Sequence, residues 1–366
     1  MLNLAKYYIN HKIHNTTQTA DKFVDIIRSQ NIVVIKFFQS ISTRPDLLDQ
    51  KICHSICKNL LNNCQSHSSD ITKHIFEQEC PELSPPTTII GIGSMAQVYQ
   101  WDDVTVVKIL HPNIKHDIDN ARMISKYIPE TLRRSYNFFI TNIEKQLDLK
   151  LEREMMMKYN QMITEFKLDN IINIPICFDY TNNTLWMTFV GGTTMYTHDR
   201  NIDVYYRLCL IYVHILSIYG GIINCDLHGG NWMIDKPNIS IIDYGFCMDI
   251  TNIPLSERKE LCIGFLLQDT TKIFKYIVDS PNNPTLINQI LLETQKYSDF
   301  NKCIQKIIKK YLKYIPEKYI IILYSMIHMS AWVGLNTAKP TIPLLYQSLQ
   351  IVPHFKYIFD IIFSSN

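Results

Sequence analysis

The chain has 366 residues, of which 46% are hydrophobic and 19% are charged. This balance excludes a long disordered chain, which would need few apolar and many charged side chains. The net charge is +2, with 36 basic against 34 acidic side chains, so charge alone gives no reason to expect a nucleic-acid partner.

The first 80 residues predict helices, because apolar side chains recur at helical spacing over residues 23–37 and again over 47–61. Three prolines between positions 81 and 86 then break the pattern. We therefore expect an N-terminal helical extension over residues 1–86.

The next block has the features of a sheet. Residues 87–90, 95–101 and 104–110 predict three strands, joined by a glycine turn at 91–94 and a tight turn at Asp102-Asp103. Strand, glycine turn, strand, short turn, strand is the pattern of an antiparallel meander.

The rest of the chain is mostly helical in pattern. The predicted helices cover 114–128, 140–167, 203–219 and nearly everything after Ser256. The predicted strands are 185–190 and a hairpin formed by 231–235 and 239–243. These elements predict the α+β class, with a smaller lobe over residues 87–192 and a helical lobe over 193–366.

Ten cysteines occur without a Cys-x-x-Cys pair, and most stand beside apolar residues. This is typical of reduced, buried thiols, so we expect a reducing compartment, either the cytoplasm or an organelle matrix. The first 30 residues contain no apolar block of about 7–15 residues and predict no secretory signal. Residues 319–338 lack charged side chains but include polar ones, which favours a buried helix over a membrane span.

The glycine turn carries the first candidate for chemistry, at Gly91, Gly93, Ser94 and Ala96. A dinucleotide-binding fold would need a helix directly after the glycines, and a strand is predicted there instead. Glycines between two strands let backbone N–H groups approach a phosphate, as in protein kinases. A plain hairpin turn fits the same residues, so this loop alone leaves both interpretations open.

Lys108 lies near the end of the third predicted strand, ten residues beyond Val98. A lysine beside a phosphate loop can pair with the α- and β-phosphates of a nucleotide, provided that a carboxylate holds its charge. A surface lysine on an edge strand is the alternative.

The strongest local pattern is Asp226-Leu227-His228-Gly229-Gly230-Asn231, followed twelve residues later by Asp243-Tyr244-Gly245. Phosphoryl transfer needs Mg²⁺ held by oxygen ligands and a carboxylate that faces the nucleophile. The spacing predicts Asp226 in the second role and Asn231 and Asp243 as metal ligands. Two unrelated Asp/Gly turns are the alternative, which the shared order of the motifs disfavours.

These motifs resemble the UbiB/AarF family of atypical kinase-like ATPases, which is linked to ubiquinone biosynthesis. Members carry His-Ala-Asp-Leu-His-Pro-Gly-Asn in the catalytic loop, where this chain has residues 224–231. They also carry Lys-x-Gly-Gln followed by Ser-Thr-Arg-x-Asp-Leu-Leu, which ordinary protein kinases lack. Here Lys36-Phe37-Phe38-Gln39 and residues 42–48 stand in these places. The resemblance covers about residues 30–275.

The chain departs from the family pattern at several positions. Phe38 replaces the glycine of Lys-x-Gly-Gln, and Gln146 replaces the first acid of a Glu-x-Asp motif. Gly91 and Gly93 replace alanines of the family's phosphate loop. The lysine and metal positions are retained.

The resemblance implies a two-lobed protein-kinase-like fold with an N-terminal helical extension, and an ATP- and Mg²⁺-dependent kinase or ATPase. It implies that Glu152 is the carboxylate partner of Lys108, and that Met187 and Val190 line the adenine pocket. It also implies a gate in which the extension lies across the nucleotide cleft, formed by Lys36, Gln39 and Asp148. A lipid or membrane-associated partner is a further candidate, and no nucleic acid is expected.

Two other functions stay open. A small-molecule phosphotransferase of the aminoglycoside-kinase type has a similar catalytic loop, but the segment from Lys36 to Leu48 argues against it. A nucleotide-binding pseudokinase scaffold would dock a lipid or protein without turnover. The cysteines and histidines between residues 53 and 80 could suggest zinc, but their spacing matches no closed tetrahedral pattern.

Overall fold

The structure is a computed structural model that describes residues 2–40, 42, 49–60, 66–127, 130–194, 204–227, 229–278, 284–297 and 300–333. The chain divides into two compact units. The first comprises Met1–Glu154 with Pro175–Val190, and the second comprises Met155–Ile174 with Gly191–Asn366.

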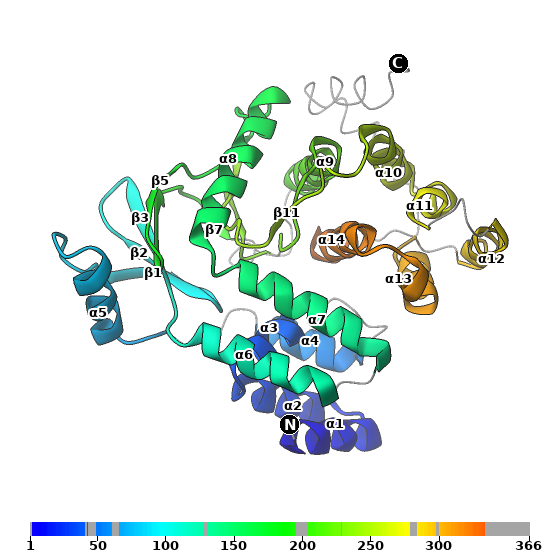
Figure 1. Ribbon diagram of the computed structural model, residues 1–366, viewed down its shortest axis with the longest axis horizontal. Coiled ribbons are helices and arrows are strands. Elements are labelled where there is room, and N and C mark those ends of the chain that lie inside the picture. Colours follow the sequence, from blue (N-terminus) through cyan, green and yellow to red (C-terminus); the bar gives the residue numbers. More distant parts are fainter. Residues whose placement is uncertain are drawn as a thin grey trace. The chain divides into compact units, whose positions relative to one another are not determined.

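The first unit contains the N-terminal helices together with the largest sheet (Figure 1). Its helices are α1 (Leu2–His14), α2 (Thr17–Arg28), α3 (Ile32–Ser40), α4 (Gln50–Asn59), α5 (Ser69–Glu79), α6 (Ile114–Ile124), the 3-10 turn η1 (Ser125–Tyr127), α7 (Glu130–Lys145) and the start of α8 (Leu149–Glu165). Its strands are β1 (Thr88–Ile92), β2 (Ala96–Gln100), β3 (Thr105–Leu110), β5 (Cys177–Tyr180) and β6 (Thr184–Thr188).

The five strands form one antiparallel sheet in the order β1-β2-β3-β6-β5. The predicted meander is therefore present, but the predicted glycine turn was too long. Gly91 and Ile92 belong to β1, because they pair with β2 after a register shift next to Ile89. Only the stretch from Gly93 to Met95 makes the turn.

One face of the sheet packs against α5. Tyr99, Val107 and Trp186 come from three adjacent strands and form a buried core with Phe76 of the helix. The rings of Phe76 and Trp101 stack at 6.0 Å between centroids. Because side chains alternate along a strand, Lys108 lies on the opposite face of the sheet from Val107.

Two hydrophobic cores meet at the extension, and α3 contributes to both. Phe23 and Ile27 of α2 form the first core with Ile52 and Ile56 of α4, and Phe38 packs against it. Val33 belongs to the second core, which is built mainly from α6 and α7. The extension is therefore part of the first unit and not a detached domain.

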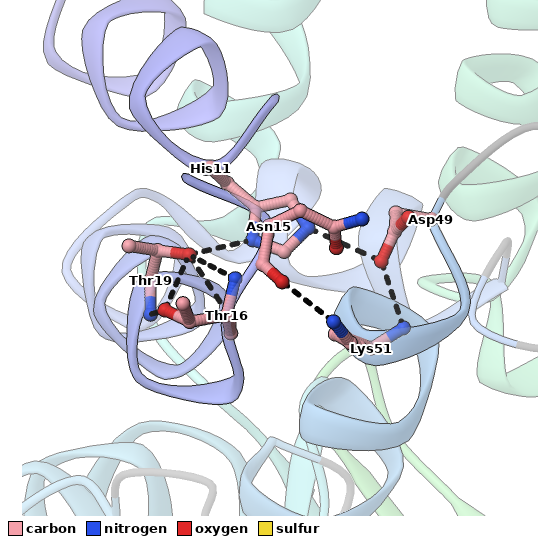
Figure 2. A network of polar contacts seen from close by, with 6 residues as sticks. All are labelled: His11, Asn15, Thr16, Thr19, Asp49 and Lys51. Carbon is pink, nitrogen blue, oxygen red and sulfur yellow. Dashed lines mark hydrogen bonds and ion pairs between the residues drawn. The ribbon is translucent and has the colours of Figure 1, made fainter. Parts of the chain in front are cut away.

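Figure 2 shows how α1 is fastened to α2 and α4 by polar contacts. The imidazole of His11 is fully buried, with Nδ1 2.9 Å from Thr19 Oγ1 and Nε2 3.1 Å from the Asp49 carboxylate. Lys51 donates to the carbonyl of Asn15 at 2.5 Å. Asp49 also accepts from the Lys51 N–H and caps α4, so its carboxylate joins α1 to α4.

The second unit is largely helical with two small sheets. Its helices, after the C-terminal part of α8, are α9 (Val204–Gly220), α10 (Leu255–Leu267), α11 (Thr270–Ile277), α12 (Pro284–Thr294), α13 (Phe300–Tyr311), the 3-10 turn η2 (Leu312–Tyr314) and α14 (Glu317–Val333). Its strands are β4 (Ile172–Asn173), β7 (Thr193–Thr194), β8 (Ile222–Asn224), β9 (Trp232–Asp235), β10 (Asn238–Ile241) and β11 (Cys247–Asp249).

The predicted hairpin is β9 and β10, which sit in a four-stranded sheet ordered β4-β10-β9-β7. The single helix predicted over 140–167 is wrong, because α7 ends at Lys145 and α8 begins at Leu149. Asp148 accepts the N–H of Leu151 at 3.0 Å, which is how an aspartate starts a new helix. Within the described part of the chain, no helix is both long and apolar enough to cross a bilayer.

Candidate functional site

Lys108 and Glu152 form a buried ion pair in the first unit. The ammonium of Lys108 donates to both carboxylate oxygens of Glu152, at 2.7 and 2.9 Å. The two side chains are only 11% and 2% exposed. The partner predicted for Lys108 is therefore correct, although the lysine and the glutamate are 44 residues apart.

The register of the sheet shows what surrounds this lysine. Lys108 pairs with Val98 of β2 and with Leu185 of β6, so these three side chains share one face. Val106 and Met187 pair two residues further along the same two strands, so they lie on this face as well, and both are buried. Met187, predicted to line the adenine pocket, and Lys108, predicted to contact phosphate, thus lie on the same face of the sheet.

The predicted phosphate loop, from Gly91 to Ala96, is closed by backbone bonds. Gly93 N–H donates to Ala96 O at 2.8 Å, and His111 N–H donates to Met95 O at 2.9 Å. Ser94 and Ala96 are buried, whereas Gly93 is exposed. Neither Gly91 nor Gly93 has a positive φ, so their backbone conformation does not demand glycine.

Of the three residues predicted to form a gate, two lie on α3 and the third directly precedes α8. Gln39 is buried and donates to Leu60 O at 3.1 Å, which ties the end of α3 to the end of α4. Lys36 is half-buried on α3, and Asp148 is exposed at the start of α8. Most of the motif expected at 42–48 lies outside the described residues. The gating role of these residues stays a prediction.

Phe38 stands where the family has glycine, and its side chain packs within the N-terminal helical extension. Its ring meets Phe23 edge-on at 5.6 Å between centroids. The next residue back, Phe37, turns instead to Phe139 at 5.2 Å. The bulky substitution is thus accommodated by packing between α2 and α3.

In the second unit, Asp226 and Asn231 are held in one loop after β8. The amide nitrogen of Asn231 donates to Asp226 O at 2.8 Å, which directs the amide oxygen of Asn231 away from that carbonyl. Asn231 directly precedes β9, and its carbonyl accepts from Ile242 N–H at 3.0 Å. His228 of this motif lies outside the described residues.

Asn224 is a site residue that sequence reasoning missed. Its side-chain oxygen accepts from Asp226 N–H at 3.0 Å, while its side-chain nitrogen donates to Asp243 O at 2.7 Å. One buried amide therefore joins the loops of both motifs. The signal was available, since Asn224 stands where the family's catalytic loop begins with histidine.

Asp243 is fixed from its own side as well. One carboxylate oxygen accepts the N–H of Gly245 at 3.0 Å. Tyr244 is buried against Tyr159 of α8, with 5.3 Å between ring centroids. Burial raises the pKa of both tyrosines, so both rings stay neutral phenols in this packing.

Asn231 and Asp243, the predicted metal ligands, thus lie in two loops that Asn224 joins, and their metal role stays a prediction. A carboxylate and an amide oxygen are the hard ligands that Mg²⁺ prefers, and no thiol or imidazole was predicted as a ligand. Among the described residues, there is no group of three or more His, Cys, Asp and Glu side chains that could hold a metal ion.

Comparison with protein families gives a match to the ABC1 atypical kinase-like domain over residues 84–277, just over half of the chain. The chain belongs to this family. The match includes the phosphate loop, the Lys108–Glu152 pair and both loops joined by Asn224. It confirms the resemblance to the UbiB/AarF proteins and the two-lobed kinase-like α+β fold expected from it.

Curated relatives agree with this assignment. The chain is 27% identical to the probable serine/threonine-protein kinase abkC of Dictyostelium discoideum over 241 residues, covering 58% of this chain and 35% of that protein. It is 23% identical to the ABC1 family protein MCP2 homolog of Schizosaccharomyces pombe over 268 residues, covering 63% of this chain and 48% of that protein. The chain thus spans about a third to a half of these relatives.

Solved structures give weaker similarities. The Rv3197–erythromycin complex from Mycobacterium tuberculosis is 14% identical with a TM-score of 0.47, covering 82% of this chain and 92% of that chain. The Rio2 kinase–ADP/Mg²⁺–phosphoaspartate complex from Chaetomium thermophilum is 12% identical with a TM-score of 0.30, covering 84% of this chain and 85% of that chain. The family assignment does not depend on either.

The Lys108–Glu152 pair predicts that the loss of one charge destabilises the fold more than the loss of both. Glu152→Ala leaves a buried ammonium without its carboxylate and should lower the free energy of unfolding by about 3–5 kcal/mol. Lys108→Met combined with Glu152→Leu removes both charges and should unfold near the wild-type denaturant midpoint. Chemical denaturation measures both variants. A double variant as unstable as Glu152→Ala would contradict the explanation by charge.

Asn224 predicts a second effect on stability. Asn224→Ala removes the buried amide that donates to Asp243 O and accepts from Asp226 N–H, and should cost about 1–3 kcal/mol of unfolding free energy. Asn252→Ala, in the exposed turn after β11, is the matched control and should be neutral. Equal midpoints for the two variants would show that the bridge does not stabilise the loops.

Proposed function

We propose that this ABC1-family chain binds ATP with Mg²⁺ and uses it for phosphoryl transfer or ATP hydrolysis. The observation that carries the proposal is the buried Lys108–Glu152 pair. Burying two charges is costly, and a hydrophobic pair of similar volume would serve stability at least as well. A nucleotide phosphate gives the ammonium a function that a hydrophobic side chain lacks.

In the first unit, Lys108 would pair with the α- and β-phosphates while Glu152 holds the ammonium in place. Backbone N–H groups of the loop from Gly91 to Ala96 would cover the phosphates. Val106 and Met187, buried on the face of the sheet that carries Lys108, would contact the adenine ring, with Val190 following β6.

In the second unit, Asn231 and Asp243 would hold Mg²⁺. The bound metal would neutralise charge on the phosphates as the terminal phosphoryl group is transferred. The orientation of the Asn231 amide supports this role. Its nitrogen donates a hydrogen bond to Asp226 O, so the amide oxygen is directed away from that carbonyl. The Asp226 carboxylate would orient the attacking hydroxyl or water and accept its proton.

The acceptor of the phosphoryl group is a separate matter. One relative is described as a probable serine/threonine-protein kinase, which supports transfer to a hydroxyl group. Hydrolysis of ATP needs the same residues with water as the acceptor. A scaffold without turnover would need the nucleotide-binding residues but not the Asp226 carboxylate. A lipid or membrane-associated partner stays a hypothesis from the family resemblance.

Nucleotide binding should require both the metal and Asp243. ATP at 100 times its dissociation constant stabilises a fold by about 2.7 kcal/mol, so the melting temperature should rise when ATP and Mg²⁺ are added together. The rise should vanish with EDTA and for Asp243→Asn. Asp235→Asn, at an exposed position ending β9, is the matched control and should keep the full rise.

Two outcomes would contradict this proposal. Equal shifts with EDTA or in Asp243→Asn would remove the metal role. ATP binding without Mg²⁺-dependent hydrolysis or phosphoryl transfer, together with an unchanged affinity for Asp226→Asn, would support the scaffold instead.

A further inference from the structure

His67 and His111 form a pair that touches the phosphate loop and has no part in the chemistry proposed above. His67 lies just before α5, and His111 directly follows β3. Their Nδ1 atoms are 2.8 Å apart, and their rings meet edge-on with centroids 5.0 Å apart. On its far side, Nε2 of His111 lies 3.0 Å from Gly93 O.

The acceptor at Gly93 fixes where the protons lie. A carbonyl oxygen can only accept, so His111 must carry its hydrogen on Nε2. A neutral His111 then has a lone pair on Nδ1, which accepts from Nδ1–H of His67. It follows that Nε2 of a neutral His67 has no hydrogen and must itself accept.

The surroundings of His67 supply the donor that this arrangement needs. Nε2 lies 3.1 Å from the hydroxyl of Thr72, whose oxygen is 2.6 Å from the hydroxyl of Tyr99. Tyr99 in turn accepts from the side-chain amide of Gln97. A single line of donors therefore runs in one direction, from Gln97 through Tyr99, Thr72, His67 and His111 to Gly93.

The linker before α5 is held to the sheet by backbone bonds too. The side-chain oxygen of Gln97 accepts from His67 N–H at 3.2 Å, and its nitrogen donates to His67 O at 3.3 Å. Gln97 and Thr72 are fully or almost fully buried. His67 thus has little freedom to move away from His111.

We propose that the His67–His111 pair positions the phosphate loop for nucleotide binding, and that it does so in its doubly neutral form. The inference rests on the proposed nucleotide site. His111 holds the loop twice, through its imidazole at Gly93 O and through its backbone N–H at Met95 O. His67 orients the imidazole of His111, so both histidines are positioning residues.

The electrostatic surroundings favour the neutral form. Burial and the neighbouring His111 lower the pKa of His67 to about 4. Burial also lowers the pKa of His111, against the opposing effect of its bond to Gly93. The groups that bond to the pair are the neutral Thr72 of α5 and Gln97 of β2. The phenol of Tyr99 lies beyond Thr72, and no described carboxylate bonds to either imidazole.

Protonation would oppose the line of donors. A proton on Nε2 of His67 would face the Thr72 hydroxyl hydrogen, and two charged rings would bring two Nδ1–H groups together. An unfolded histidine has a pKa near 6.5, whereas that of folded His67 is about 4. Between these two pH values the unfolded chain therefore binds a proton at His67 and the folded chain does not. The free energy of unfolding should therefore decrease as the pH falls from about 6.5 to about 4.

The pH dependence is tested with a variant that cannot titrate. In His67→Asn, the side-chain amide can donate to His111 from nearly the position of Nδ1–H. Its free energy of unfolding should fall less steeply than that of the wild type between pH 6.5 and 4. His74→Asn, exposed on α5, is the control and should keep the wild-type slope. Parallel slopes for wild type and His67→Asn would overturn the requirement for a neutral pair.

The positioning role is tested by comparing ATP with adenosine at pH 7.5. His111→Ala removes the donor to Gly93 O and should weaken Mg²⁺-ATP binding about 3- to 10-fold, the usual worth of one hydrogen bond. Adenosine has no phosphates, so its affinity should stay the same. His111→Gln can still donate from near the position of Nε2 and should keep ATP affinity within about twofold of wild type.

Hydrogen exchange separates this inference from the proposed function. Without nucleotide, amides of the loop from Gly91 to Ala96 should exchange faster in His111→Ala than in the wild type, while α7 exchanges at the same rate. If the wild type bound no ATP, the proposed function would fail while this measurement still tested the anchor. Unchanged exchange, or an equal loss of ATP and adenosine affinity in His111→Ala, would overturn the positioning role.

Discussion

The buried ion pair between Lys108 and Glu152 constrains the whole first unit. Neither charge can be buried alone, so β3 and α8 must meet at this point. The pair also fixes which face of β3 is turned toward α8, because Val107 and Ile109 pack against α5 on the opposite face. A register slip of one residue would place the ammonium of Lys108 among Phe76 and Trp186. The ion pair and the aromatic core therefore enforce the same register from opposite faces.

In the second unit, hydrogen bonds hold the two loops with the proposed site residues together. Asp226 and Asp243 lie in loops, which lack the regular backbone hydrogen bonds of a helix or a strand. Asn224 compensates by using both ends of one amide, accepting from one loop and donating to the other. Because this amide is buried, any separation of the two loops would leave a polar group without a partner. A short side chain thus holds the loop geometry that the proposed chemistry requires.

The sequence predicted the elements whose signals are strong and repeated. The meander and the β9–β10 hairpin follow from alternation and turn residues, and the partner of Lys108 follows from the family resemblance. It did not predict β8 and β11, since strands of three residues show no period. The break between α7 and α8 depends on one cap at Asp148, and the bridge by Asn224 depends on tertiary contacts. Neither leaves a periodic signal.

The proposed phosphate loop depends on parts of the chain that precede the kinase-like domain. The family match begins at residue 84, yet Met95 shares a core with Val33 of α3, and His111 is oriented by His67 before α5. Neighbouring residues of a helix point in different directions, so Phe37 can pack on α7 while Phe38 packs on α2. Through α3, the core of the extension is continuous with the core beside the loop. A boundary drawn at residue 84 would therefore cut through packing and hydrogen bonds that hold the loop, which makes the extension a structural part of the nucleotide-binding unit proposed here.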